Sequence, residues 1–117
     1  MKEFLLLIRN EVDHWDSMNS EQQQLHITQV SNYIKDLSKN GKLKDSQPLS
    51  MNGLILHKSG NIFKDGPFIE SKEVIGGYFH ICAEDLGEAV EIAKAYPAFE
   101  GNSRIEVREI PKVEGIN

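Results

Sequence analysis

The sequence predicts an α+β domain in which an antiparallel sheet carries two helices on one face. Two observations support this prediction. Short apolar or alternating runs, which are typical of strands, recur along the chain, and two segments with apolar residues three and four positions apart, typical of helices, lie between them. The chain has 117 residues, enough for one core, so we expect residues 1–117 to form a single domain.

The first strand and the first helix can be placed from local sequence. Residues 4–8 are a continuous apolar run, which suits a central strand, and we expect a polar loop over residues 9–18. Ser20 and Gln23 match a capping box, so a helix is predicted to begin there, and Gly41 is a typical stop signal. The apolar stripe of this helix consists of residues at spacings of three and four, namely Ile27, Val30, Ile34 and Leu37.

The middle of the chain contains turn and strand signals in alternation. We expect a loop around Pro48 and then a hairpin, because residues 54–57 and 61–64 are strand-like and a Ser-Gly pair lies between them. Residues 74–82 form the next strand, which is apolar and long enough to be central. Its Gly-Gly pair is unfavourable in a strand and indicates a bulge, or a close approach by another backbone or a ligand.

The last helix and strand have clear boundaries. Asp85 and Glu88 match a second capping box, and Pro97 is expected to end the helix because the residue before a proline avoids helical angles. Residues 103–110 alternate between apolar and charged side chains, as in a half-buried strand. The inward stripe of the helix is predicted to be Leu86, Ala89, Val90, Ala93 and Tyr96.

This order of elements is the ferredoxin-like βαββαβ pattern with an extra hairpin strand. Because both helices cover the same face of the sheet, alternation places four side chains on the other face: Tyr78, His80, Glu106 and Arg108. Such a mixed polar and aromatic face is either solvated or a subunit interface, and we expect the interface. The sequence therefore predicts a homodimer with clefts or a shared cavity between its subunits.

Composition excludes several classes of partner. The chain has 13 Lys and Arg against 18 Asp and Glu, a net charge of −5, which argues against nucleic acid. No apolar run approaches the ~20 residues of a membrane span, so we expect no membrane partner. The one cysteine rules out an internal disulfide and fits a reducing cytoplasm.

The stretch from residue 64 to residue 78 is the centre of the functional argument. Gly66 can adopt backbone angles closed to other residues, and Pro67 fixes its own φ, so Asp-Gly-Pro makes a stiff turn. Such a turn can hold the Asp65 carboxylate in a fixed position. A turn-forming role, in which the carboxylate bonds the following backbone N–H groups, is the alternative.

This stretch resembles the signature of the YCII-related family, in particular its DGPF-domain branch. The matching residues are Asp65-Gly66-Pro67-Phe68, then Glu70, then Lys72-Glu73, and then Gly76-Gly77. The resemblance continues through the second helix and the last strand, so it covers nearly the whole chain. It implies a dimeric α+β barrel of ferredoxin-like subunits. It also implies that some relatives are small-molecule enzymes that work through a His–Asp pair.

The resemblance gives candidate catalytic residues. Asp65 matches the motif, and His26 lies on the first helix, where a histidine is common in such proteins. A carboxylate beside an imidazole fixes its tautomer and raises its basicity, which suits acid–base chemistry near pH 7. The cleft is expected to contain Glu70, Lys72, Tyr78 and His80. The alternatives are an exposed helix position for His26, packing at the dimer interface for Tyr78 and His80, and a solvated loop for Glu70 and Lys72.

Three functions follow from these residues. The first is a cofactor-independent enzyme of isomerase or lyase type that transfers protons on a small molecule. The second is a non-catalytic dimeric module that binds a ligand or assists another protein, because no complete catalytic constellation can be identified in the chain. The third, metal-dependent catalysis, has little support, since His14 with Asp13 and Asp16 lacks a second histidine. We therefore expect neither a cofactor nor a metal.

Overall fold

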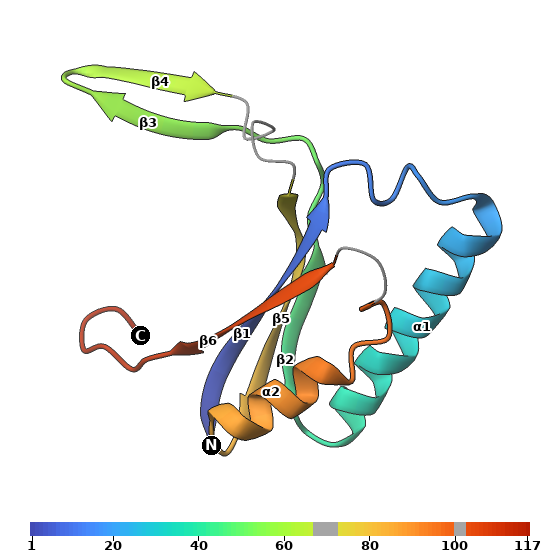
Figure 1. The fold of residues 1–117 in the computed structure, drawn as a ribbon. Coiled ribbons are helices and arrows are strands. Elements are labelled where there is room, and N and C mark those ends of the chain that lie inside the picture. The colour runs from blue at the N-terminus through green and yellow to red at the C-terminus, as the bar shows by residue number, and fades with distance from the viewer. Residues whose placement is uncertain (67–72, 100–102) are drawn as a thin grey trace.

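A computed structural model describes residues 1–66, 73–99 and 103–117, with the backbone alone described for residues 64–66. Its main feature is a four-stranded antiparallel sheet of order β2-β5-β1-β6, with two helices on one face (Figure 1). The helices are α1 (Ser20–Lys39) and α2 (Leu86–Lys94). The strands of this sheet are β1 (Lys2–Glu11), β2 (Leu43–Pro48), β5 (Glu73–Ala83) and β6 (Arg104–Ile110). The predicted α+β class is confirmed, and the strand order is compatible with a ferredoxin-like fold.

Strand β2 was not predicted. Pro48, which was expected in a loop, is the last residue of this strand, and the loop begins after it, at residues 49–54. The sequence of β2, LKDSQP, is polar, and most of its residues are exposed. It forms because its backbone pairs with β5, which would otherwise present unpaired N–H and C=O groups at the sheet edge. Pro48 is tolerated there because β2 is an edge strand and Pro48 is its last residue.

The predicted hairpin forms, but it is not an extra strand of the main sheet. Within the described part of the chain, strands β3 (Ile55–Ser59) and β4 (Ile62–Gly66) pair only with each other, as a second sheet. The turn between them contains Gly60, whose φ of 61° is a left-handed conformation that favours glycine. In Figure 1 this hairpin projects as an arm from the end of the main sheet.

The helix caps differ in detail from the predicted capping boxes. In α1 the box lies one residue earlier: the Asn19 Oδ1 atom accepts from the Gln22 N–H and the Gln22 Oε1 atom accepts from the Asn19 N–H, both at 2.9 Å. In α2 the Asp85 Oδ1 atom accepts from the Glu88 N–H at 2.8 Å, as predicted. The Glu88 carboxylate instead accepts from the Glu84 N–H and binds Lys42. Asparagine is as good an N-cap as serine, so residue type does not distinguish a capping box at Asn19 from one at Ser20. The backbone conformation of the folded chain decides between them.

The core lies between the helices and the sheet face that they cover. Alternate residues of β1 and β5 are buried there, and three aromatic rings fill the space beneath α1 with edge-to-face contacts at 5.3–5.8 Å between centroids. The rings belong to Tyr33, Phe79 and Tyr96. The predicted helix stripes are correct except at the first residue of each, because Ile27 and Leu86 are each about half exposed.

The glycine pair marks both a bulge and a close approach, as predicted. The pairing of β1 with β5 shifts between Ile8 and Arg9, so that no residue of β1 is paired with Gly76. A Cβ atom at Gly76 would lie 2.7 Å from the Asn10 Nδ2 atom, and one at Gly77 would lie 3.1 Å from the Gln47 carbonyl oxygen. Side chains larger than hydrogen therefore cannot fit at either position without a shift of their neighbours.

The face of the sheet away from the helices, here named the open face, carries the four predicted side chains. Leu5 pairs with His80 and Arg108, and Leu7 pairs with Tyr78 and Glu106, all on this side. Most of these residues are half-buried in the single chain. Among the described residues, neither helix is both long and apolar enough to cross a membrane.

Candidate functional site

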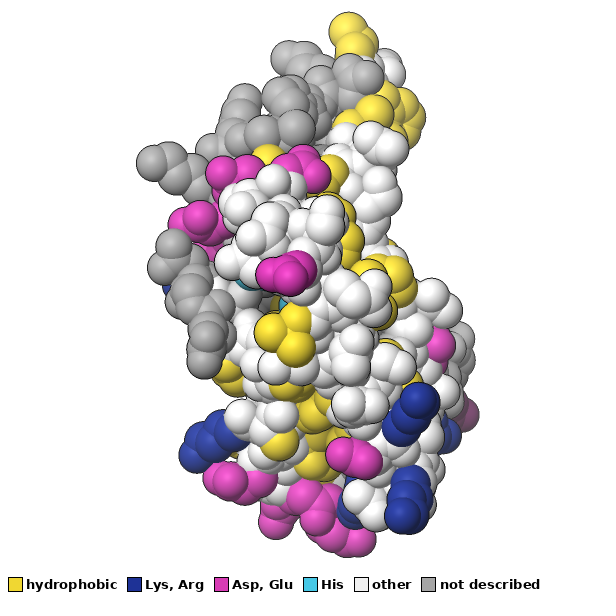
Figure 2. Space-filling view, turned by 90° about the vertical axis from the view of Figure 1, so that its right-hand side faces the viewer, with side chains coloured by type: hydrophobic (Ala, Val, Ile, Leu, Met, Phe, Trp, Pro, Cys, Tyr) yellow, Lys and Arg dark blue, Asp and Glu magenta, His cyan; other side chains and the backbone are white. Residues whose placement is uncertain are grey.

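A cavity of about 560 Å³ lies between α1 and the covered face of the sheet. Its walls come from the segment after β1, one side of α1, the end of β2 and the bulged part of β5. Most of the lining is apolar, including Ile8, Val30, Ile34, Val74 and Phe79. This volume and character suit a small organic molecule. Figure 2 views this side of the molecule, and histidine shows there only as small areas beneath other side chains.

Two imidazoles and an indole meet at one part of this lining. The His26 ring packs edge to face against Trp15 and His14, with centroid separations of 6.0 and 6.1 Å. His26 comes from α1, whereas Trp15 and His14 come from the turns that follow β1. Gln23 fixes these turns against α1, since its Nε2 atom donates to the Trp15 carbonyl at 3.0 Å. The backbone of His14 is bound in turn to Glu11.

The surroundings of His26 keep its imidazole neutral. Burial lowers the pKa of His26 below its ordinary value, and electrostatic repulsion by nearby His14 lowers it further. A neutral imidazole has one nitrogen that accepts a proton and one that donates a hydrogen bond. His26 can therefore act as a base toward a molecule in the cavity.

Other polar groups of the cavity come from β1 and β5. Asn10 lines the cavity beside Gly76, and its Oδ1 atom accepts a 2.6 Å hydrogen bond from the buried Ser103 hydroxyl. Tyr78 is also among the residues around the cavity, but alternation places its side chain on the other face of the sheet, where its hydroxyl donates to the Asp45 Oδ2 atom at 2.7 Å. This bond raises the pKa of Tyr78, so its hydroxyl stays protonated.

His80 lies on the open face, on the opposite side of the sheet from His26. Its Nε2 atom is 2.8 Å from the Glu3 Oε1 atom, and Lys112 approaches the other oxygen of Glu3 at 3.1 Å. These two partners, Lys112 first, lower the pKa of Glu3. The structure therefore does not bring His80 together with His26, although the sequence placed both near one cleft.

The remaining predicted site residues cannot be placed in the cavity from the structure. Pro67, Glu70 and Lys72 lie outside the described residues. Asp65 and Gly66 lie in β4, where their Cα partners are Leu56 and Ile55, and the Asp65 side chain is outside the described part. The pairing of Asp65 with His26 stays a prediction.

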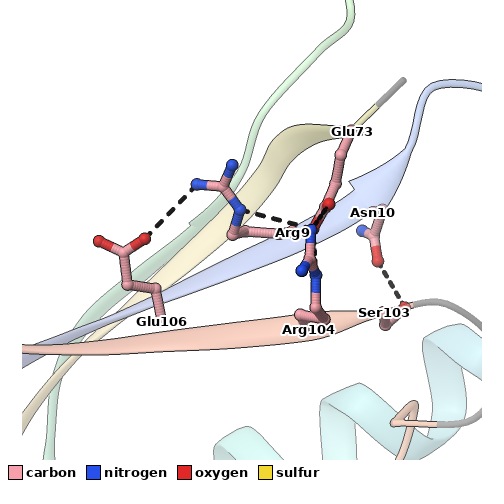
Figure 3. A network of polar contacts seen from close by, with 6 residues as sticks. All are labelled: Arg9, Asn10, Glu73, Ser103, Arg104 and Glu106. Atoms are coloured by element: carbon pink, nitrogen blue, oxygen red, sulfur yellow. Dashed lines mark hydrogen bonds and ion pairs between the residues drawn. The ribbon is translucent and has the colours of Figure 1, made fainter. Parts of the chain in front are cut away.

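A network of charges occupies the open face close to the bulge (Figure 3). The Arg9 guanidinium lies between Glu73 and Glu106, with Nε 3.4 Å from Glu73 and NH1 3.5 Å from Glu106. Arg104 also binds Glu73 through two nitrogens, one of them at 2.9 Å. The network ties β1, β5 and β6 together beside the segment that carries Asn10.

Sequence reasoning missed the role of Trp15 and Asn10 in the lining. Trp15 lies in a segment that was predicted only as a polar loop, where no periodic pattern of apolar residues marks a buried position. Asn10 comes shortly after the apolar run, and its proximity to Gly76 depends on strand register.

Among the described residues, no three His, Cys, Asp or Glu side chains are grouped closely enough to hold a metal ion.

Comparison with known proteins identifies the family of the chain. The family model of the YCII-related domain matches residues 3–113, which is nearly the full length. No curated protein matches the chain. Because the matched region includes the sheet, both helices and the cavity between them, the chain belongs to the YCII-related family.

Proposed function

We propose that the chain is a small-molecule enzyme that performs acid–base chemistry without a cofactor, with the cavity as its site. One observation supports this most directly: a partly buried His26 imidazole with a lowered pKa lines a largely apolar cavity of about 560 Å³. Neutral bases of this kind remove protons from carbon next to a carbonyl group, and the same imidazole can return the proton to a different carbon. An isomerisation or elimination of this type needs no oxidant or metal.

Proton transfer to His26 creates an imidazolium in surroundings that disfavour it. A carboxylate partner would stabilise that charge and orient the ring. We propose Asp65 for this role, and its support is the Asp-Gly-Pro-Phe motif. We also propose, from the same motif, that the chain belongs to the DGPF branch of the family. Glu70 and Lys72 follow Asp65 in the same motif, and we propose that they lie at the entrance of the cleft.

The test is exchange of substrate protons in deuterated solvent. A panel of small lactones and cyclic hydroxy acids is incubated with enzyme, and NMR follows replacement of the C–H next to the carbonyl. We expect His26→Gln and Asp65→Asn to slow exchange by about 10²–10⁴-fold, the usual contribution of one acid–base group. Gln29→Ala, on the exposed side of α1, is the control and should exchange at the normal rate. Normal exchange in both site variants would refute the enzymatic proposal.

A second candidate is a non-catalytic module that binds the same class of ligand. The apolar lining favours it, because burial of ligand surface there needs no chemistry. The same NMR samples separate the two candidates. Ligand-induced shifts of the cavity residues without any exchange of substrate protons would favour the binding module.

We further propose a homodimer in which two open faces pack against each other as a dimeric barrel. Its support is the composition of this face, where Leu5, Leu7 and Tyr78 lie half-buried among charged residues. Light scattering at micromolar concentration should give twice the chain mass, and Leu7→Glu should give the monomer. We place this dimer in the cytoplasm, which suits the free thiol of Cys82 on the same face.

A further inference from the structure

The β3–β4 arm is too exposed and too small to be stable by itself. It forms its own two-stranded sheet, and a two-stranded hairpin is marginal in water without further packing. Five large apolar residues on or next to it are each at least 57% exposed, namely Leu54, Ile55, Leu56, Ile62 and Phe63. Figure 2 shows hydrophobic side chains uncovered on the part that projects at the top. Such a concentration of exposed apolar surface indicates an interaction site.

Among the described residues, no segment covers either apolar face of the arm. The pairing of Ser59 with Ile62 places Ile55 and Ile62 on one face, whereas Leu56 and Phe63 lie on the other. On that second face the Lys58 ammonium lies 5.4 Å from the centre of the Phe63 ring, a cation–π contact that covers only part of the ring. A partner must therefore supply the missing packing.

The chain exposes more surface than a compact chain of its size, and a second copy could bury the excess. Its accessible surface is 8269 Å², against about 6,400 Å² for a compact chain of this size. Its radius of gyration is 16.3 Å, against about 13 Å expected. Two such chains could bury about 3,500 Å² between them, which is within the range of obligate homodimers.

Charge also favours a second copy of this chain as the occupant. Residues 54–66, which include the whole arm, contain Lys58 and Lys64 against one acid, Asp65, a net charge of +1, whereas the whole chain has a net charge of −5. The arm is therefore slightly basic on an acidic protein, and it is attracted to the acidic surface of a second copy of the chain. A nucleic acid would not suit so apolar a segment.

We propose that the β3–β4 arm is an exchange arm, which reaches across the subunit boundary and packs on the second copy. This inference rests on the proposed face-to-face dimer. In Figure 1 the arm leaves the end of the sheet and points away from α1 and α2. Its strands of five residues span about 17 Å, enough to pass the edge of one sheet and contact the other subunit.

The test measures dimer affinity in variants that add charge to one arm face at a time. Analytical ultracentrifugation compares the wild-type chain with Ile55→Asp/Ile62→Asp and Leu56→Asp/Phe63→Asp. The control, Gln24→Asp/Gln29→Asp, adds the same charge to the exposed side of α1. We expect at least one arm variant to weaken the dimer tenfold or more, with the control within twofold of wild type.

Hydrogen exchange of the wild-type chain is a second measurement, and it does not depend on whether the variants fold. Amides of residues 55–59 and 62–63 should be protected in the wild-type dimer and should lose protection on dilution into the monomer range. An unchanged dimer affinity in both arm variants, with arm amides that exchange freely in the dimer, would overturn the exchange arm and leave the face-to-face dimer standing. A wild-type chain that is monomeric at 100 µM would overturn both.

Discussion

The Trp15 indole and the His26 imidazole meet edge to face, with their ring centroids 6.0 Å apart. Trp15 belongs to the turns that follow β1, and His26 belongs to α1, so the contact fixes the wall of the cavity where the two segments meet. Both residues line the cavity. A molecule that enters it therefore alters the surroundings of an indole and of the proposed base together.

Fluorescence of Trp15 should report occupancy of the cavity. The chain has one tryptophan, so its emission comes from this site alone. Apolar ligands that bind the cavity should change this emission in a saturable way. Val30→Phe, which adds volume to the lining, should weaken the response at least fivefold, whereas Gln29→Phe on the exposed side of α1 should not. An equal response in both variants would place the ligand elsewhere.

The pKa of His26 should lie below the ordinary histidine value of 6.5 in an NMR titration. Burial is the main cause and electrostatic repulsion by His14 the second, so His14→Gln should raise the pKa of His26 only partly. A His26 pKa at or above 6.5 would contradict the proposed burial.

The same shift makes stability depend on pH. Because the folded chain holds the pKa of His26 below its unfolded value, the unfolded state binds the proton more readily. The stabilisation is complete above pH 6.5, the unfolded value, and is lost as the pH falls toward the folded pKa. Urea unfolding at pH 7.5 and 5.5 should show a larger loss of stability in wild type than in His26→Gln. Equal losses in the two proteins would contradict this linkage.

The glycine pair should be sensitive to added methyl groups for two different reasons. Gly77→Ala brings a methyl group against the Gln47 carbonyl of β2, and we expect it to cost about 1–3 kcal/mol in the free energy of unfolding. Gly76→Ala instead displaces the Asn10 amide and with it the bond to Ser103. The cost of Gly76→Ala should therefore be smaller in an Asn10→Ala background. Additive costs in this double-mutant cycle would show that the two groups do not compete for space.

Tyr33 should contribute to stability through one hydrogen bond between the helices. Its hydroxyl donates to the Ile92 carbonyl at 2.6 Å, and burial raises the pKa of Tyr33 well above its ordinary value. Tyr33→Phe removes the donor and leaves the ring, so we expect a loss of about 1 kcal/mol in chemical denaturation. Tyr78→Phe, whose bond to Asp45 is exposed, is the control and should cost less.

Glu3 should make the open face sensitive to acid. Lys112 and His80 lower the pKa of Glu3 below 4.5, so its stabilising effect is present above pH 4.5 and is lost as the pH falls through the folded pKa. Wild type should therefore lose more stability than Glu3→Gln between pH 5 and pH 3. Lys112→Gln should reduce the difference. A Glu3→Gln variant with the same acid profile as wild type would contradict the assignment.

Local sequence determined the class of the fold and most of its elements. Some features depend only on residues a few positions apart and are therefore visible in the sequence. They are the apolar run of β1, the alternation in β6 and the caps near α1 and α2. The Gly76-Gly77 pair likewise predicted a close approach within β5 before the neighbour was known. The motif that begins at Asp65 gave the family, because it fixes many residue types in one short stretch.

Tertiary structure alone decided how the candidate residues are distributed. Alternation showed that His80 lies on one side of β5, but only the packing of α1 against the other side separates it from His26. Strand β2 has a polar sequence and exists because the edge of β5 requires a partner, which no property of residues 43–48 reveals. The contact of Trp15 with His26 likewise depends on a turn whose direction is set by Gln23 and not by periodicity. Pairing and packing join residues far apart in the chain, so local patterns cannot specify them.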